Sequence, residues 1–168
     1  MDFLIFSDSH GRSDLVGEML SRCRPDVILC CGDGLWDLAN QHTARPLYVV
    51  RGNCDVLPPP SLFVGGEMVN EVLVNEGGMR LLLMHGHTYN VKYGLESAIF
   101  RAAELDADAL VFGHTHRRVN VMLTPEEHPC LKKRLHLFNP GSLHDAPHSF
   151  GTLTVRNGVP LFHHGELE

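Results

Sequence analysis

The stretch DFLIFSDSH, residues 2–10, joins a short apolar run directly to a cluster of polar side chains. An apolar run that ends this abruptly is typical of a buried β-strand followed by a tight loop. The same arrangement recurs where DVILCC (26–31) precedes Gly-Asp-Gly and where ADALVF (107–112) precedes Gly-His-Thr-His. Because helical stretches separate these runs in the first two thirds of the chain, the sequence predicts βαβ units and an α/β fold.

Further helices and strands are predicted along all 168 residues. Apolar residues at helical spacing predict helices over 12–23 and 95–105 and a short helix that begins near Leu35. Additional strands are predicted at 46–50, 67–75, 79–84, 134–138, 151–155 and 159–163. Hairpin turns are predicted at Gly77-Gly78 and Asn157-Gly158. We expect one α/β domain over residues 1–168, with a mainly parallel sheet from the first two thirds and an antiparallel second sheet from the last third.

Composition narrows the classes of protein to which the chain can belong. Hydrophobic residues make up 43% and charged residues 20%, which is typical of a soluble globular protein. The net charge of −6 argues against a nucleic-acid partner, and no apolar run approaches the roughly 18 residues of a membrane span. Five cysteines without a CxxC pair, together with an acidic N-terminus, favour a reduced protein in the cytoplasm.

Polar side chains follow most of the predicted strands at the point where each strand ends. These side chains are Asp8, His10, Asp33, Asn53, Asp55, His85, His87, His114 and His116. Loops at the carboxyl ends of strands in open α/β sheets converge on one crevice, where ligands bind. Each motif alone also has an ordinary interpretation, as a turn or an exposed histidine. Their recurrence after successive strands favours one shared site.

The ligand types in this set indicate two metal ions. Two aspartates, one asparagine and four histidines exceed the three protein ligands of an open catalytic zinc site, and they suit two ions that share one carboxylate. Asp33 lies on the central loop and fits that bridging position. Two divalent ions can act together on a phosphoryl displacement. A mixed carboxylate, amide and imidazole set without thiolate favours Mn, Fe, Co, Zn or Mg over Cu(I).

The ordered motifs resemble those of the calcineurin-like metallophosphoesterases, most closely their small prokaryotic YfcE-like phosphodiesterase branch. The motifs are D-x-H (8–10), GD (32–33), GN-x-D (52–55), HGH (85–87), GHTH (113–116) and NPGS (139–142). The resemblance covers nearly the whole chain and implies a β-sandwich flanked by helices, in α/β/β/α layers. One metal would then be held by Asp8, His10, Asp33 and His116, and the other by Asp33, Asn53, His85 and His114.

The resemblance also implies a reaction. A hydroxide that bridges the two ions would attack phosphorus in line, while Asn53 and the ions stabilise the charged oxygens. The expected cofactors are two divalent ions, with Mn favoured and Fe, Co, Zn, Ni or Mg as alternatives. The substrate would be a small phosphate ester, and a homodimer is an alternative to a monomer. Rival functions are a phosphomonoesterase, a nucleotide pyrophosphohydrolase and a protein-binding scaffold similar to the retromer subunit that has this fold.

One departure from the family concerns the residue after Asn53. Much of the superfamily has a GNHE motif, whose histidine protonates the leaving group or contacts the phosphate, whereas here the residue is Cys54. A thiol is a poor substitute for imidazolium as a proton donor, so we expect a preference for activated esters or diesters. The predicted catalytic residues are Asn53, Cys54, Asp55 and His87.

Other residues are expected to contact the substrate or to support the loops. The guanidinium groups of Arg12, Arg117 and Arg118 can reach phosphate oxygens from positions next to the ligand loops. Asn139 and Ser142 are expected to shape the loop that braces the site. Seven histidines outside the motifs are expected to be exposed or hydrogen bonded locally, namely His42, His128, His136, His144, His148, His163 and His164.

Overall fold

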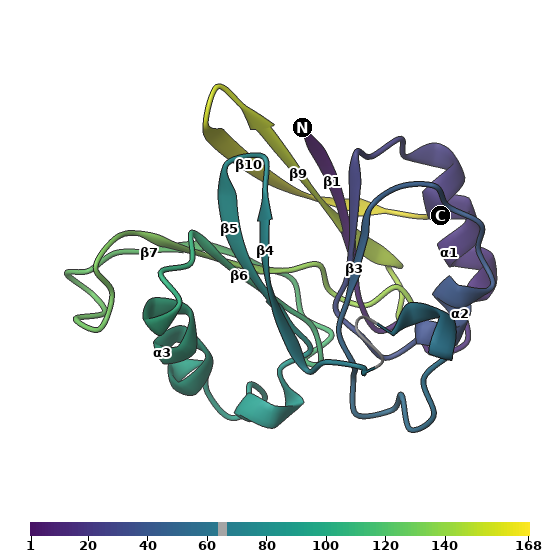
Figure 1. Ribbon diagram of the computed structural model, residues 1–168, viewed down its shortest axis with the longest axis horizontal. Coiled ribbons are helices and arrows are strands. Elements are labelled where there is room, and N and C mark those ends of the chain that lie inside the picture. The colour runs from purple at the N-terminus through teal and green to yellow at the C-terminus, as the bar shows by residue number, and fades with distance from the viewer. Residues whose placement is uncertain (64–66) are drawn as a thin grey trace.

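A computed structural model describes residues 1–63 and 67–168 as two mixed sheets with helices on both outer sides (Figure 1). The first sheet has the strand order β10-β9-β1-β2-β3. Its strands are Asp2–Phe6 (β1), Val27–Cys30 (β2), Leu47–Val49 (β3), Ser149–Arg156 (β9) and Val159–Glu166 (β10). β1, β2 and β3 pair in parallel, whereas β9 and β10 form an antiparallel hairpin at the other side of β1.

The second sheet has the strand order β4-β5-β6-β8-β7. Its strands are Glu71–Glu76 (β4), Met79–Met84 (β5), Ala109–Phe112 (β6), Val119–Leu123 (β7) and Leu135–Asn139 (β8). β5, β6 and β8 pair in parallel, and the two edge strands are antiparallel to their neighbours. Each sheet therefore contains three parallel strands, and the predicted polar loops follow those six strands.

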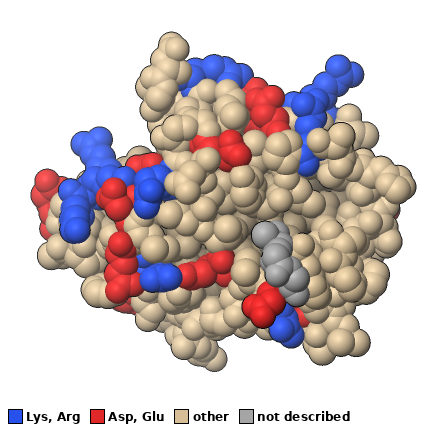
Figure 2. Space-filling view, in the orientation of Figure 1, with Lys and Arg blue, Asp and Glu red and all other residues tan. Residues whose placement is uncertain are grey.

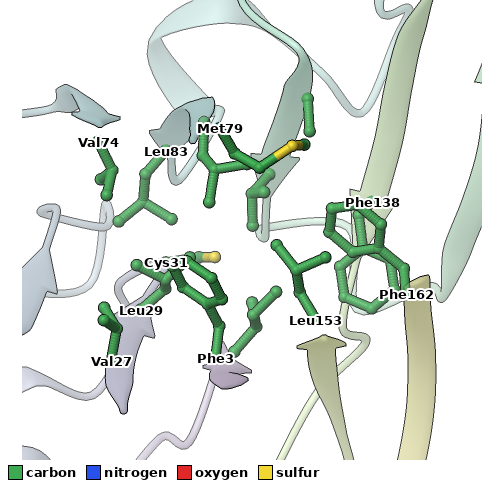
Figure 3. Close-up of a cluster of buried hydrophobic side chains, with 14 of the residues drawn as sticks. Phe3, Val27, Leu29, Cys31, Val74, Met79, Leu83, Phe138, Leu153 and Phe162 are labelled. Atoms are coloured by element: carbon green, nitrogen blue, oxygen red, sulfur yellow. The ribbon is translucent and has the colours of Figure 1, made fainter. Parts of the chain in front are cut away.

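Unbroken apolar runs, whose side chains point alternately to the two faces, explain why both faces of each sheet are buried. Phe3 and Ile5 point between the two sheets, where they pack with residues such as Leu83 and Phe138 (Figure 3). Leu4 and the other residues on the opposite face of β1 pack outward against helices. Successive strand residues face opposite sides, so an unbroken apolar run such as 2–6 needs a cover on both sides.

The helices supply these covers. Ser13–Arg22 (α1) and Leu35–Ala39 (α2) pack on the first sheet, and Glu96–Glu104 (α3) packs on the second (Figure 1). Two short 3₁₀ turns, Pro60–Leu62 (η1) and His87–Tyr89 (η2), complete the elements of the described residues. The order of layers is α/β/β/α, as predicted.

Element types agree closely with the prediction, and most boundaries differ by one or two residues. The strand expected over 67–75 begins at Glu71, and the three residues at 64–66 lie outside the described part of the chain. Both predicted hairpins are present, with positive φ at Gly77, Gly78, Asn157 and Gly158. β7 was not predicted because its middle residues face solvent and show no regular apolar pattern.

The predicted division into a parallel first sheet and an antiparallel second sheet is wrong. β8 joins β6 in the second sheet, while the β9–β10 hairpin pairs with β1 in the first. Strand partners are chosen by contacts between distant segments, such as the ring of Phe138 against Gly151, where a Cβ would collide with that ring. A period-two pattern fixes which face of a strand is buried, but it carries no information about the neighbouring strand.

Charged groups on the surface are mixed in sign. On the face shown in Figure 2, several Lys and Arg side chains lie beside Asp and Glu side chains in small groups. Arg101 pairs with Glu71 and Lys133 with Asp108. Within the described residues, no helix combines the length and the apolar character that crossing a membrane would require.

Candidate metal centre

The loops after the six parallel strands lie together at one edge of the two sheets. His85, which follows β5, donates from Nδ1 to the carbonyl oxygen of Cys31 at 2.8 Å, which joins the two sheets. The backbone N–H of His114 donates to Oδ2 of Asp8 at 3.1 Å and makes a second link between them. The predicted convergence of the loops is therefore present, although the loops come from two sheets.

The first group of potential ligands consists of Asp8, His10 and His116. Nε2 of His116 lies 3.2 Å from Oδ1 of Asp8, and Nε2 of His10 lies 3.7 Å from the same oxygen. The two Nε2 atoms are 3.4 Å apart. Three donor atoms from two loops thus face one small volume.

The second group consists of Asp33, His85 and His114. Nε2 of His85 lies 3.3 Å from Oδ2 of Asp33 and 3.1 Å from Nδ1 of His114. Oδ1 of Asn53 is 3.1 Å from the same Nε2. Carboxylate, amide and imidazole donors are therefore adjacent, as the motif order predicts.

Asp33 belongs to the second group and also faces the first. Its Oδ2 is 3.3 Å from Nε2 of His85 and 3.8 Å from Nε2 of His10. Its other oxygen, Oδ1, accepts the backbone N–H of Cys54 at 2.7 Å. The hydrogen bond fixes the carboxylate, so that one oxygen remains directed at ligands from both groups.

Backbone strain is concentrated at the ligand positions. Positive φ angles of 40–65° occur at Asp8, His10, Asp33, His114 and His116. Residues other than glycine rarely adopt this region, and such outliers cluster at functional sites. The loops approach closely at Gly52, where an added Cβ would collide with Oδ1 of Asp33. The surrounding fold therefore holds the backbone of these residues in a conformation that an unconstrained loop would not adopt.

Two further side chains position predicted ligands. Asp145 accepts a hydrogen bond from Nδ1 of His116 at 2.5 Å, which directs Nε2 of that ring toward Asp8. Asp37 accepts from Oγ of Ser9 at 2.7 Å and from the backbone N–H of Gly11 at 2.9 Å, and so fixes the loop that carries His10. Ring orientation of this kind tunes metal ligands. Neither residue could be predicted, because neither belongs to a strand-end motif.

Asp55, which was predicted to be catalytic, accepts hydrogen bonds from the backbone of the loops around it. Its Oδ2 accepts the backbone N–H groups of Asp33 and Gly52 at 2.7 and 2.9 Å. Its Oδ1 accepts those of Gly34 and Leu35 at 3.0 and 3.1 Å. Both oxygens of Asp55 thus accept backbone N–H groups of the loops that carry Asp33 and Asn53.

Asn139 and Ser142 brace the site, as expected. The side-chain amide of Asn139 donates to the carbonyl oxygen of Gly113 at 2.9 Å. Oγ of Ser142 donates to the carbonyl oxygen of Asp8 at 3.1 Å. The NPGS loop therefore fixes the backbones of the two loops that carry Asp8 and His114.

The donor set fits divalent cations. Oδ1 of Asp8 is buried and has no hydrogen-bond partner among the described residues, although a buried carboxylate oxygen normally has one. The Nε2 atoms of His10 and His116 face this oxygen at 3.7 and 3.2 Å. A cation beside this oxygen would satisfy it, and the oxygen and nitrogen donors match borderline to hard divalent ions.

The close approach of carboxylates and imidazoles shifts the pKa values of several side chains in the site. Burial acts to raise the pKa of Asp8, but its interactions with His10 and His116 outweigh this and lower it. The pKa of His116 rises to about 9, mainly because of Asp8 and then, against the effect of burial, Asp145. Burial, followed by the charge of His85, lowers the pKa of His114 to about 4. The carboxylate of Asp8 is thus ionised at neutral pH.

Cys54 and His87 lie next to the potential ligands. The amide of Asn53 contacts Sγ of Cys54 at 3.3 Å, and that thiol forms a further potential ligand group with His10 and Asp33. Sequence reasoning did not consider Cys54 as a ligand. Burial and the neighbouring Asp33 raise the pKa of the Cys54 thiol. The ring of His87 lies 5.4 Å from that of His85, and its buried Nδ1 has no partner among the described residues.

The three predicted substrate arginines differ in their surroundings. Arg12 donates two hydrogen bonds to Asp14, and Arg118 pairs with Glu166 at 2.6 Å. Arg117 lines a cavity next to the loop 113–116. Of the histidines outside the motifs, His144 has its ring edge-on to that of His10 at 5.8 Å.

Comparison with known proteins identifies the family. The model of the calcineurin-like phosphoesterase superfamily domain matches residues 1–158. The chain is 33% identical over 164 residues to the probable metallophosphoesterase YsnB of Bacillus subtilis, covering 94% of this chain and 86% of that protein.

Solved structures share the fold at lower identity. YfcE, a phosphoesterase from Escherichia coli, aligns with a TM-score of 0.62 and 23% identity over 92% of this chain and 88% of its own. Vps29 from Entamoeba histolytica, solved with Zn²⁺, aligns with a TM-score of 0.67 and 22% identity over 99% of both chains. The match of the family model over residues 1–158 and the 33% identity to YsnB establish that the chain belongs to the calcineurin-like phosphoesterase superfamily.

Proposed function

We propose that the chain is a phosphodiesterase that uses two divalent metal ions. The observation that carries the proposal is the position of Asp33, whose Oδ2 faces both His10 and His85 at 3.8 and 3.3 Å. Two ligand groups that share one carboxylate suit a pair of ions better than one ion. The buried Oδ1 of Asp8, which lacks a partner among the described residues, supports a cation on the first side.

Each ion would have its own set of ligands. The first set is Asp8, His10, Asp33 and His116, and the second is Asp33, Asn53, His85 and His114. Mn²⁺ is the favoured ion, and Fe, Co, Zn, Ni and Mg are the alternatives. When bound, two such ions neutralise phosphate charge and lower the pKa of a coordinated water.

The residues of the chain position the ester. Buried loops hold Asp8 and His85 beneath the surface, so the phosphoryl group would enter from the side of Asn53 and Cys54, which are exposed. His87 would contact the ester from the other side of His85. A thiol in place of imidazolium offers weak proton donation to a leaving group. The preferred substrates are therefore small diesters with good leaving groups.

The experiment combines metal analysis with a substrate panel. Protein purified without chelators would be analysed for bound metal and assayed with Mn²⁺ on an aryl phosphodiester, an aryl phosphomonoester and a dinucleoside polyphosphate. We expect about two metal equivalents per chain and the highest kcat/KM on the diester. A higher value on the monoester or the polyphosphate would assign the same site to a phosphomonoesterase or a nucleotide pyrophosphohydrolase.

A protein-binding scaffold is the second candidate. The side chains of Trp36, Val56 and Leu57 are 56%, 69% and 80% exposed, and Trp36 donates from Nε1 to the carbonyl oxygen of Leu57 at 2.8 Å. Contiguous exposed apolar groups mark many interaction surfaces, and this one adjoins the loop of Asn53 and Cys54. Absence of turnover on all three substrates with metal bound would favour the scaffold over the enzyme.

A further inference from the structure

A cavity of about 470 Å³ lies beside the candidate metal centre. Thr115, between the predicted ligands His114 and His116, forms part of its wall. On the other side, Val91 forms part of the wall, and its backbone N–H donates to the carbonyl oxygen of Gly86 at 3.3 Å. The cavity is thus connected by short chain segments to the loops that carry His85 and His114.

The interior of this cavity is mainly apolar. Phe112 is 1% exposed and Val91 is buried, and both line it together with the partly buried Leu95 and Val119. Small-molecule sites typically have volumes of about 300–1,000 Å³ and apolar walls with few polar groups. The volume therefore suits a group of the size of a nucleoside.

Two basic side chains lie at the edge of the cavity. Lys92 and Arg117 line it and are exposed, and neither side chain forms an ion pair with the described residues. By contrast, Arg12 and Arg118, which also lie close in sequence to predicted ligands, each form an ion pair with an acidic side chain. In a chain of net charge −6, two cations that line one cavity and have no acidic partner in the described part of the chain offer a local site for an anionic group.

We propose that this cavity binds the part of the substrate beyond the scissile phosphate, and that this part combines an aromatic or apolar ring with a second anionic group. The ring lies on Phe112 and its apolar neighbours, and the anionic group contacts Lys92 and Arg117. Nucleotides that carry two separate phosphate groups have this chemistry. The inference rests on the proposed function, because the first phosphate is assigned to the metal centre.

The test compares three ligands by calorimetry with Mn²⁺ in excess. Adenosine 3′,5′-bisphosphate has the aromatic base and both phosphates, adenosine 5′-monophosphate lacks the second phosphate, and fructose 1,6-bisphosphate has a sugar ring and two phosphates but lacks the aromatic base. We expect the nucleoside bisphosphate to bind about tenfold more tightly than the monophosphate, since two exposed charge contacts contribute roughly this much. It should also bind more tightly than fructose 1,6-bisphosphate, because the base buries apolar surface in the cavity. The double variant Lys92→Gln/Arg117→Gln should lose the advantage over the monophosphate.

A matched variant removes the same charge elsewhere. Lys132→Gln/Arg134→Gln changes two basic residues just before β8, at the other end of that strand from the NPGS loop, and should keep the tenfold difference. Equal affinities for the two adenosine ligands in the unaltered protein would overturn the anion site, and tight binding of fructose 1,6-bisphosphate would overturn the role of the ring. If the proposed function itself is wrong, the protein should neither hydrolyse diesters nor bind metal. These two results are distinct from the comparison of ligand affinities.

Discussion

Nδ1 of His116 and Oδ2 of Asp145 lie 2.5 Å apart, so a carboxylate that belongs to no recognised motif fixes the orientation of a predicted metal ligand. The bond leaves Nε2 of His116 directed toward Oδ1 of Asp8 at 3.2 Å. Asp145 itself is held by its backbone N–H, which donates to Oγ of Ser142 at 3.0 Å. The NPGS loop therefore positions His116 through Asp145.

We predict that Asp145→Ala weakens Mn²⁺ binding about 10- to 100-fold, the usual effect of removing a group that orients a metal-bound histidine. Asp145→Asn should have a smaller effect, because its amide oxygen still accepts from Nδ1 of His116. Competition with a chelating dye would measure both affinities, and circular dichroism would verify the fold. Equal affinities in both variants and in the unaltered protein would refute this role.

Asp33→Ala and His114→Ala should each abolish diester hydrolysis and metal retention. The loss in kcat/KM should exceed the roughly 100-fold typical of residues behind the ligands, because these side chains are themselves predicted ligands. Mn²⁺ at 100 times its Kd should stabilise the unaltered protein by about 2.7 kcal/mol, and thermal melts should show little of this gain in Asp33→Ala.

The exposed His163 provides a control for these variants. His163→Ala changes a histidine on β10, a strand that lies at the far edge of the first sheet from β3. Its activity and its stabilisation by Mn²⁺ should equal those of the unaltered protein. Near-normal hydrolysis by both Asp33→Ala and His114→Ala would discredit the two-metal assignment.

Cys54→His should raise activity on esters with poor leaving groups. A well-placed general acid contributes about 100-fold or more, and we expect a gain of roughly tenfold for an alkyl leaving group because the surrounding loop is not shaped for imidazole. The gain should vanish for a nitrophenyl leaving group, which departs without a proton. A Cys130→His variant, which alters another exposed cysteine, should match the unaltered protein across the series.

The site was more predictable than the arrangement of the sheets. The six strand-end motifs are local, so the ligand types and their convergence could be derived from runs such as 2–10 and 107–116. The partners of β8 and β9 depend on long-range packing, including the contact of Phe138 with Gly151. Asp145 could not be predicted for a similar reason, because its contact with His116 joins residues 29 positions apart.

A motif specifies a residue type without the direction of its side chain, as Asp55 illustrates. GN-x-D places a carboxylate next to predicted ligands, and that proximity suggested catalysis. In the folded chain the carboxylate points back to the N–H groups of Asp33 and Gly52. A carboxylate that accepts several backbone bonds stabilises a loop and has little capacity left for substrate.

Glu71 forms a network that fastens α3 and η2 to β4, and it should make stability depend on pH. Its Oε1 accepts from Nη2 of Arg101 at 2.7 Å, and its Oε2 accepts from the hydroxyl of Tyr89 at 2.6 Å. Burial acts to raise the pKa of Glu71, but the bonds from Arg101 and Tyr89 outweigh it and lower the pKa. A carboxyl group with a lowered pKa stabilises the fold above its unfolded pKa, and this contribution is lost as pH falls through the folded value.

Glu71→Gln should therefore lower the urea midpoint at pH 7, and the difference from the unaltered protein should shrink as pH falls below about 4.3, the ordinary pKa of glutamate. Chelator would be present throughout, so that metal binding does not contribute. Glu96→Gln is a matched control, because Glu96 is exposed and forms no ion pair with the described residues. A Glu71→Gln deficit that stays constant from pH 7 to pH 3 would show that packing, and not the ionised carboxylate, accounts for the effect.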